Sequence, residues 1–147
     1  MLDFAGIDCR RLLVNAKPNE VFFTSGGTES DNWAVFGGAY AQKAVGRTHI
    51  ITTMIEHHAV KAAVEKLEKE GFSVTWLPVN DRGMVEVNTL KAALTDKTGI
   101  VAVMLANNET GVLQDVKAFA QIAHENGSIF RSEKLTNVFS FRFGKFF

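Results

Sequence analysis

The sequence contains a single cysteine, Cys9, which excludes an internal disulfide and is typical of a reducing compartment. Sixteen lysines and arginines balance sixteen aspartates and glutamates, and no basic block could follow a nucleic acid or an anionic membrane. No apolar run approaches the roughly 18 residues of a membrane-spanning helix, and the amino terminus lacks the pattern of a signal peptide. We therefore expect a cytoplasmic protein with no nucleic-acid or membrane partner.

Alternating patterns of apolar residues indicate the fold class. The chain has 147 residues, 46% of them hydrophobic, which is enough for the core of one domain. Helical patterns cover residues 3–15, 28–44, 56–70, 88–94 and 115–126, and strand patterns cover residues 21–24, 48–53, 72–78, 100–106 and 128–130. Strands separated by helices predict right-handed βαβ crossovers. The prediction is an α/β fold with three αβα layers and a mainly parallel sheet.

Two of these segments carry further expectations about packing. The helix at residues 28–44 is largely apolar, so we expect it to be well buried, with Gly37 and Gly38 permitting close packing. Residues 100–106 form a continuous apolar run, which is typical of a strand covered on both faces.

Residues 21–32 suggest an anion site. They read Val-Phe-Phe-Thr-Ser-Gly-Gly-Thr-Glu-Ser-Asp-Asn, a pattern that predicts a strand, a tight turn and a helix. The first N–H groups of a helix lack intrahelical partners and carry the positive end of its dipole, and glycine lets a phosphate approach the backbone. One hypothesis is a phosphate site at residues 25–28. The other is an ordinary capped turn, because Ser or Thr followed by an acid is also a capping arrangement.

Two more polar clusters follow expected strands: residues 56–58, Glu-His-His, and residues 107–109, Asn-Asn-Glu. Ligands of parallel sheets gather at the carboxyl ends of the strands, so the clusters predict one shared site. His57 is either a polar residue at a helix boundary or a ring that covers an aromatic cofactor or carries a proton. Asn108 either stabilises a turn or binds a hydroxyl or ring oxygen of a ligand.

The remaining histidines and the cysteine do not form a pattern of their own. Adjacent histidines at a helix start, such as His57 and His58, project to different sides, and neither His49 nor His124 completes a familiar metal-ligand spacing. We expect no metal site. Nothing near Cys9 indicates an activated thiolate, so we interpret it as a bystander.

Three segments together resemble motifs of the cysteine desulfurases, class-V aminotransferase-like enzymes of fold type I that use pyridoxal 5′-phosphate (PLP). They are residues 22–32, residues 55–60 (Ile-Glu-His-His-Ala-Val) and residues 107–115 (Asn-Asn-Glu-Thr-Gly-Val-Leu-Gln-Asp). Their order and spacing match the family, and the resemblance covers about residues 9–130. It implies that residues 1–130 are part of a PLP-dependent transferase large domain.

The resemblance also implies roles for individual residues. Gly27 and Thr28 match the donors to the cofactor phosphate, through the backbone and the hydroxyl. His57 matches the histidine that stacks on the pyridine ring and takes part in proton transfer, and Asn108 matches the asparagine that contacts the ring hydroxyl. Asp31 belongs to the same motif, and we assign it to helix stabilisation.

After residue 130 the sequence departs from the family pattern His-x-Asp-x-x-Gln and reads Arg-Ser-Glu-Lys-Leu-Thr. By direct spacing, Glu133 stands where the family has the aspartate that pairs with the pyridine nitrogen. Glu133 keeps the negative charge that holds this nitrogen protonated, with one more methylene in its side chain. Thr136 stands in place of the glutamine and is too short to reproduce its contact.

Residues 131–147 form a divergent tail. Five of the twelve phenylalanines lie at residues 139–147, in an alternation that predicts an edge strand, either paired with another chain or packed as a terminal strand. No histidine in the sequence is followed by lysine, so the Ser-x-His-Lys segment with the cofactor-binding lysine is not among these residues. The family loop with the persulfide-forming cysteine is not among them either. We expect a truncated or frame-shifted product.

The family reaction converts L-cysteine to L-alanine and an enzyme persulfide, which supplies sulfur-acceptor proteins and iron–sulfur cluster synthesis. The resemblance therefore implies a PLP-binding segment of a homo-oligomeric cysteine desulfurase, which we expect to be inactive alone. The alternative is a non-catalytic module that binds a phosphate ligand or forms a dimer.

Overall fold

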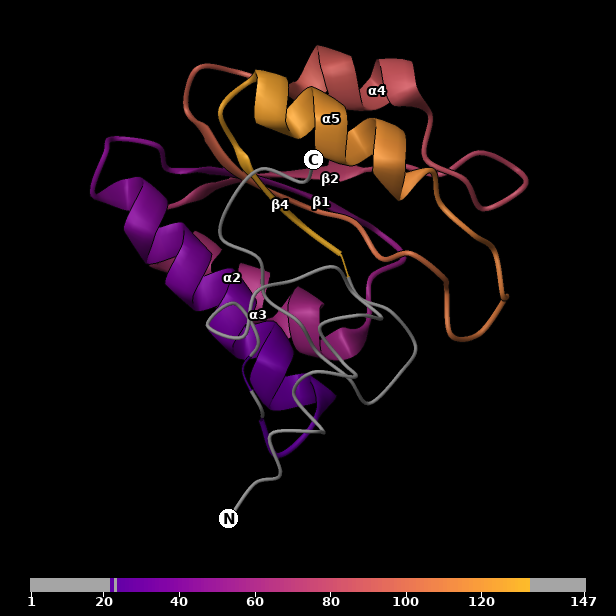
Figure 1. The fold of residues 1–147 in the computed structure, drawn as a ribbon, viewed down its shortest axis with the longest axis horizontal. Coiled ribbons are helices and arrows are strands. Elements are labelled where there is room, and N and C mark those ends of the chain that lie inside the picture. The colour runs from indigo at the N-terminus through magenta and orange to yellow at the C-terminus, as the bar shows by residue number, and fades with distance from the viewer. Residues whose placement is uncertain (1–21, 23, 133–147) are drawn as a thin grey trace, which may run out of the picture.

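The computed structural model describes residues 22 and 24–132 (Figure 1). Its elements in chain order are α2 (Gly27–Lys43), β1 (His49–Thr53), α3 (His58–Lys69), β2 (Ser73–Leu77), α4 (Val87–Ala93), β3 (Thr98–Ala102), α5 (Val116–Glu125) and β4 (Ile129–Arg131). The expected helix at residues 3–15, most of the expected strand at residues 21–24, and Cys9, Glu133 and Thr136 lie outside the described residues. Within the described part, the alternation of helices and strands is confirmed.

The four described strands form one parallel sheet in the order β2-β1-β3-β4. Each neighbouring pair is joined through a helix-containing crossover, as parallel pairing requires. β1 and β3 lie in the centre, and all five residues of each are buried. The predicted mainly parallel sheet is therefore confirmed.

Helices cover both faces of the sheet, with α2 and α3 on one side and α4 and α5 on the other (Figure 1). Side chains of a strand point alternately to opposite faces, so consecutive residues of β1 belong to different cores. Ile50 packs with Val35 and Leu67 under α2 and α3. Ile51 packs with Leu90 and Phe119 under α4 and α5. This arrangement confirms the three αβα layers.

The helix α2 is less buried than its composition predicted. Trp33 and Tyr40 are 57% and 47% exposed, whereas Val35 and Ala39 are buried. The apolar residues therefore surround the helix, and one side of it faces the surface. Gly38 does allow close packing, because a Cβ atom there would lie 3.0 Å from Ile100 Cδ1, but Gly37 faces open space.

The end of β3 and the start of α3 differ from the sequence predictions, and both differences involve Glu56. β3 spans Thr98–Ala102 instead of residues 100–106, and beyond it the Met104 amide donates to Glu56 Oε1 (2.7 Å). The helix expected from residue 56 begins at His58, while Glu56 is buried in front of it. Glu56 therefore lies in the connection between β1 and α3, from which its side chain reaches the Met104 amide.

No helix in the described part of the chain is long and apolar enough to cross a membrane.

Candidate functional site

The turn before α2 is held by an acidic side chain. Gly26 is the N-cap residue and makes no side-chain cap, so the expected Ser or Thr cap is not formed. Glu29 instead accepts hydrogen bonds from Ser25 N (2.6 Å) and Ser25 Oγ (2.7 Å). These two bonds lower the pKa of the Glu29 carboxyl below its ordinary value of 4.5. The bond from the Ser25 backbone amide has the larger effect. The carboxylate thus fixes the turn that precedes the helix.

The amides at the start of α2 remain available to a ligand. The first helical bond runs from Ser30 N to Gly26 O (3.1 Å). For the amides of Gly27 and Thr28, no hydrogen-bond partner occurs among residues 22 and 24–132. The Thr28 side chain is exposed. Partner-free N–H groups at the positive end of a 17-residue helix are suited to an anion.

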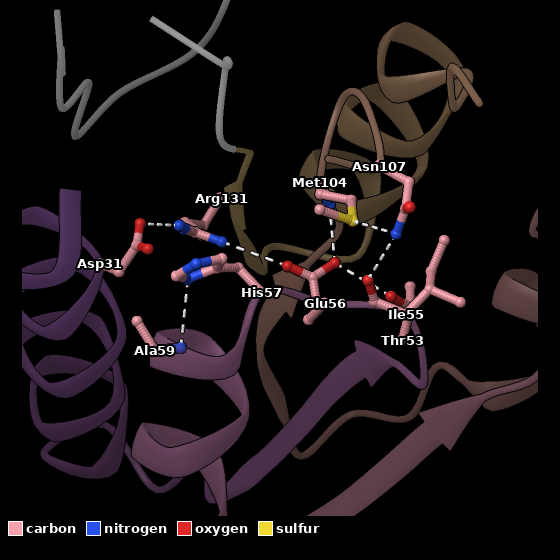
Figure 2. Close-up of polar contacts among 9 residues, drawn as sticks. All are labelled: Asp31, Thr53, Ile55, Glu56, His57, Ala59, Met104, Asn107 and Arg131. Carbon is pink, nitrogen blue, oxygen red and sulfur yellow. Dashed lines mark hydrogen bonds and ion pairs between the residues drawn. The ribbon is translucent and has the colours of Figure 1, made fainter. Parts of the chain in front are cut away.

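His57 is the N-cap residue of α3. Its Nδ1 accepts a hydrogen bond from Ala59 N (3.2 Å), which fixes the ring at the end of β1 (Figure 2). When the ring is neutral, its proton is therefore on Nε2, which can donate to a ligand. The side chain is half-buried, whereas that of His58 is exposed.

The loop after β3 is built by Asn107, which the sequence analysis did not single out. Asn107 Oδ1 accepts from Glu109 N (3.0 Å), Thr110 N (2.8 Å) and Thr110 Oγ1 (3.0 Å), and its Nδ2 donates to Ile55 O (3.1 Å). Asn108 is exposed. Asn107 therefore performs the turn-stabilising role that was one of the two alternatives for Asn108.

A buried arginine connects the ends of three segments (Figure 2). Arg131, the last residue of β4, forms ion pairs with Asp31 of α2 and with Glu56, whose Oε2 lies 3.4 Å from Arg131 Nη1. All three side chains are at least nine-tenths buried. Asp31 was expected to stabilise its own helix, and this expectation is wrong, because the carboxylate pairs with a residue 100 positions away.

These contacts join the segments that carry the expected site residues. Asp31 lies one turn after Gly27 and Thr28, Glu56 directly precedes His57, and Asn107 directly precedes Asn108. Glu133 lies outside the described residues. Glu56 and Asn107 belong to the polar clusters expected at strand ends, but no role of its own was predicted for either of them. Arg131 lies in no such cluster, and no pattern in the sequence indicated it.

No cluster of three or more His, Cys, Asp or Glu side chains in the described part of the chain could hold a metal ion.

The sequence profile of the family described as Aminotransferase class-V matches residues 9–135. The chain belongs to this family. Within it, the chain is a cysteine desulfurase-like segment. It is 51% identical over 125 residues to Cysteine desulfurase IscS of Clostridium botulinum strain Hall, and 46% identical over 120 residues to Putative cysteine desulfurase IscS 1 of Bacillus subtilis strain 168. These alignments cover 85% and 82% of this chain and 31% of each relative.

Solved structures of similar proteins share the fold of this chain. A NifS-like protein superposes with a TM-score of 0.82 at 31% identity, and DndA from Streptomyces lividans superposes with a TM-score of 0.82 at 37% identity. Each superposition covers 88% of this chain, but 36% and 37% of the respective structure. The chain thus spans about a third of the length of the relatives it matches.

Proposed function

We propose that this chain forms the phosphate-binding and ring-binding part of the PLP site of a cysteine desulfurase. In this proposal Gly27 and Thr28 bind the phosphate, His57 covers the pyridine ring and Asn108 binds the ring hydroxyl. Glu133 pairs with the pyridine nitrogen. The observation that supports the proposal most is a pair of amides at the start of α2 that have no partner in the described part of the chain. They lie on a segment joined by ion pairs to the His57 segment.

The residues present fit the chemistry of PLP. A phosphate ester is a dianion that suits N–H donors at a helix N-terminus. Because Asn107 makes the turn, the exposed Asn108 amide is left for a ligand. The ring of His57 is already oriented by its bond to Ala59 N. The amides at the start of α2 and the ring of His57 are therefore set by contacts within the protein before any ligand binds, which lowers the entropic cost of binding.

Bound PLP supplies an electron sink for bond breaking at the amino-acid substrate. The described residues of this chain hold the phosphate, orient the ring and keep a proton at Nε2 of His57. For the complete reaction we propose that L-cysteine is the substrate and that sulfur passes to acceptor proteins. That reaction also needs the family's lysine and cysteine motifs, which the 147 residues do not contain. We therefore expect the purified chain to release no sulfide or alanine from L-cysteine.

A binding titration tests the proposal. Pyridoxamine 5′-phosphate is a suitable probe because it has no aldehyde and does not react with surface lysines. We expect saturable binding to the 147-residue chain, weaker binding of pyridoxamine, which lacks the phosphate, and weaker binding to His57→Ala. His58→Ala is the matched control, because His58 is exposed next to His57, and it should bind like the wild type. Equal binding of the probe with and without phosphate contradicts the proposal.

Two further expectations belong to the same proposal. We propose a homo-oligomer in the cytoplasm, as in the family. The exposed Trp33 and Tyr40 on α2 support the oligomer, and sedimentation equilibrium of the purified chain tests it. For residues 131–147 we propose departure from the family sequence. Reading the encoding DNA in all frames tests that departure, since an intact family segment in another frame supports a frame-shift.

A further inference from the structure

We propose that Asp31, Glu56 and Arg131 form a positioning clamp that holds the start of α2 and the His57 segment in one fixed arrangement. The effect of the clamp on ligand binding rests on the proposed function. The mechanical part of the inference, that the ion pairs hold the two segments together, concerns the protein alone and can be tested without a ligand.

The clamp joins segments that share no strand pairing. Asp31 is in the first turns of α2, Glu56 is in the connection between β1 and α3, and Arg131 ends β4 (Figure 2). Arg131 also accepts a backbone hydrogen bond from Val103 N (3.0 Å), which fixes it to the chain that leaves β3. A displacement of the guanidinium would therefore move both carboxylates relative to the sheet.

Glu56 is the centre of the clamp. Its Oε1 accepts from Thr53 Oγ1 (3.0 Å) and Met104 N (2.7 Å), and its Oε2 faces Arg131. The side chain is fully buried, so each lost partner would leave an uncompensated polar group. Because His57 is the next residue, these contacts determine where its backbone leaves the sheet.

An arginine suits this role better than the histidine that the family pattern has at this position. Arginine stays charged at all ordinary pH values and presents several N–H donors in a planar fork, so two carboxylates can share it. A histidine titrates near neutral pH and offers two donors at most. The planar fork of Arg131 thus lets one side chain pair with carboxylates from both segments.

Hydrogen exchange of the full 147-residue chain without ligand tests the mechanical part. Glu56→Gln keeps the shape and the acceptor for Met104 N but removes the charge facing Arg131. We expect exchange at residues 30–34 of α2 to accelerate about fivefold or more relative to residues 119–124 of α5, by the usual size of a coupling between sites. Unchanged exchange in α2 overturns the clamp, even if the chain fails to bind PLP.

Arg47→Met is the matched control. Arg47 is a half-buried arginine at the opposite end of the sheet, where it donates to Thr98 O (2.8 Å) and Asn126 O (3.0 Å). Its loss should destabilise the chain without selectively accelerating exchange in the first turns of α2. A selective acceleration in Arg47→Met equal to that in Glu56→Gln would show that any loss of stability loosens α2, and would overturn the inference.

Ligand affinity tests the part that rests on the proposed function. With pyridoxamine 5′-phosphate under conditions where every variant is folded, we expect Glu56→Gln and Arg131→Met each to weaken binding about fivefold or more. The double variant should bind no more weakly than Arg131→Met, and Arg47→Met should stay within about twofold of the wild type. If the affinity losses of Glu56→Gln and Arg131→Met add up in the double variant, the positioning role is contradicted. It is also contradicted if Arg47→Met loses as much affinity as these variants. Absence of binding to the wild type contradicts the proposed function instead and leaves the exchange result to decide on the clamp.

Discussion

The two ends of the parallel sheet each contain an arginine with buried or half-buried partners, but the partners differ in kind. At the amino end, Arg47 donates to the backbone carbonyls of Thr98 and Asn126, both neutral. At the carboxyl end, Arg131 pairs with the carboxylates of Asp31 and Glu56. Backbone acceptors fix an arginine to the local fold, whereas side-chain carboxylates from separate segments let it connect those segments. The arginine at the amino end therefore stabilises the local fold, whereas the arginine at the carboxyl end connects separate segments, which is the basis of the proposed clamp.

The largest effect should come from Arg131→Met. It leaves two buried carboxylates without their counter-ion, and breaking a buried ion pair costs about 3–5 kcal/mol. Urea unfolding of the 147-residue chain measures this loss as a lower midpoint at unchanged slope. A loss below about 1 kcal/mol, the value of an exposed ion pair, would mean that the clamp is not desolvated in solution.

Arg47→Met should cost less, about 1–2 kcal/mol, because it removes hydrogen bonds from a cation but leaves no buried charge. Thr98 O also keeps a second donor, Ser128 Oγ at 2.9 Å. The same urea experiment measures the difference. If Arg47→Met costs as much as Arg131→Met, the distinction between the two ends of the sheet is wrong.

Neighbouring threonines of β1 offer a comparison within one strand. The buried Thr52 Oγ1 has no hydrogen-bond partner among the described residues, whereas Thr53 Oγ1 donates to Glu56 Oε1 (3.0 Å). We expect Thr52→Val to stabilise the chain by about 1 kcal/mol and Thr53→Val to destabilise it by about 1–2 kcal/mol. Thermal unfolding of the two variants measures both signs. A loss of stability in both would mean that the Thr52 hydroxyl has a partner in solution.

The smallest effect should be a pH dependence at the amino end. His49 lies between Thr98 Oγ1 and Thr75 Oγ1, at 2.8 Å from each, and burial lowers its pKa from the ordinary 6.5. The unfolded chain then binds more protons, so the His49 contribution to stability is complete above pH 6.5 and falls as the pH decreases towards the folded pKa.

His49→Gln should reduce the loss of stability that accompanies a falling pH. Urea unfolding midpoints between pH 7.5 and pH 5 measure this loss. Part of the decrease should remain, because burial also lowers the pKa of His124. A wild-type midpoint that rises on acidification would contradict the assignment.

Most of the fold could be predicted because local patterns determine it. The amphipathic α3 and α5, with the Asp115 side chain accepting from Ala118 N at the start of α5, follow their sequence patterns closely. The end of β3 could not be predicted, because residues 103–106 remain apolar after the strand pairing stops. There the boundary is set by Glu56, a residue 48 positions away that captures the Met104 amide.

The placement of the proposed site residues at strand ends could be predicted, whereas the ion pairs that join their segments could not. Gly27, Thr28, His57 and Asn108 stand in patterns with a known chemistry, so the sequence alone places them at strand ends. Arg131 stands in no such pattern, and its partners come from residues 75 and 100 positions earlier in the chain. Ion pairs of this kind depend on tertiary packing, which periodicity and local propensity do not encode.

We propose that the amides of Gly27 and Thr28, which have no hydrogen-bond partner among residues 22 and 24–132, bind the phosphate of PLP. Titration of the ¹⁵N-labelled 147-residue chain with pyridoxamine 5′-phosphate, followed by amide chemical shifts, tests it most directly. The account predicts that the largest saturable shifts occur at the amides of Gly27 and Thr28, with smaller shifts at Asn108. Shifts at Gly27 and Thr28 no larger than those of α4 and α5, on the opposite face of the sheet, would contradict it.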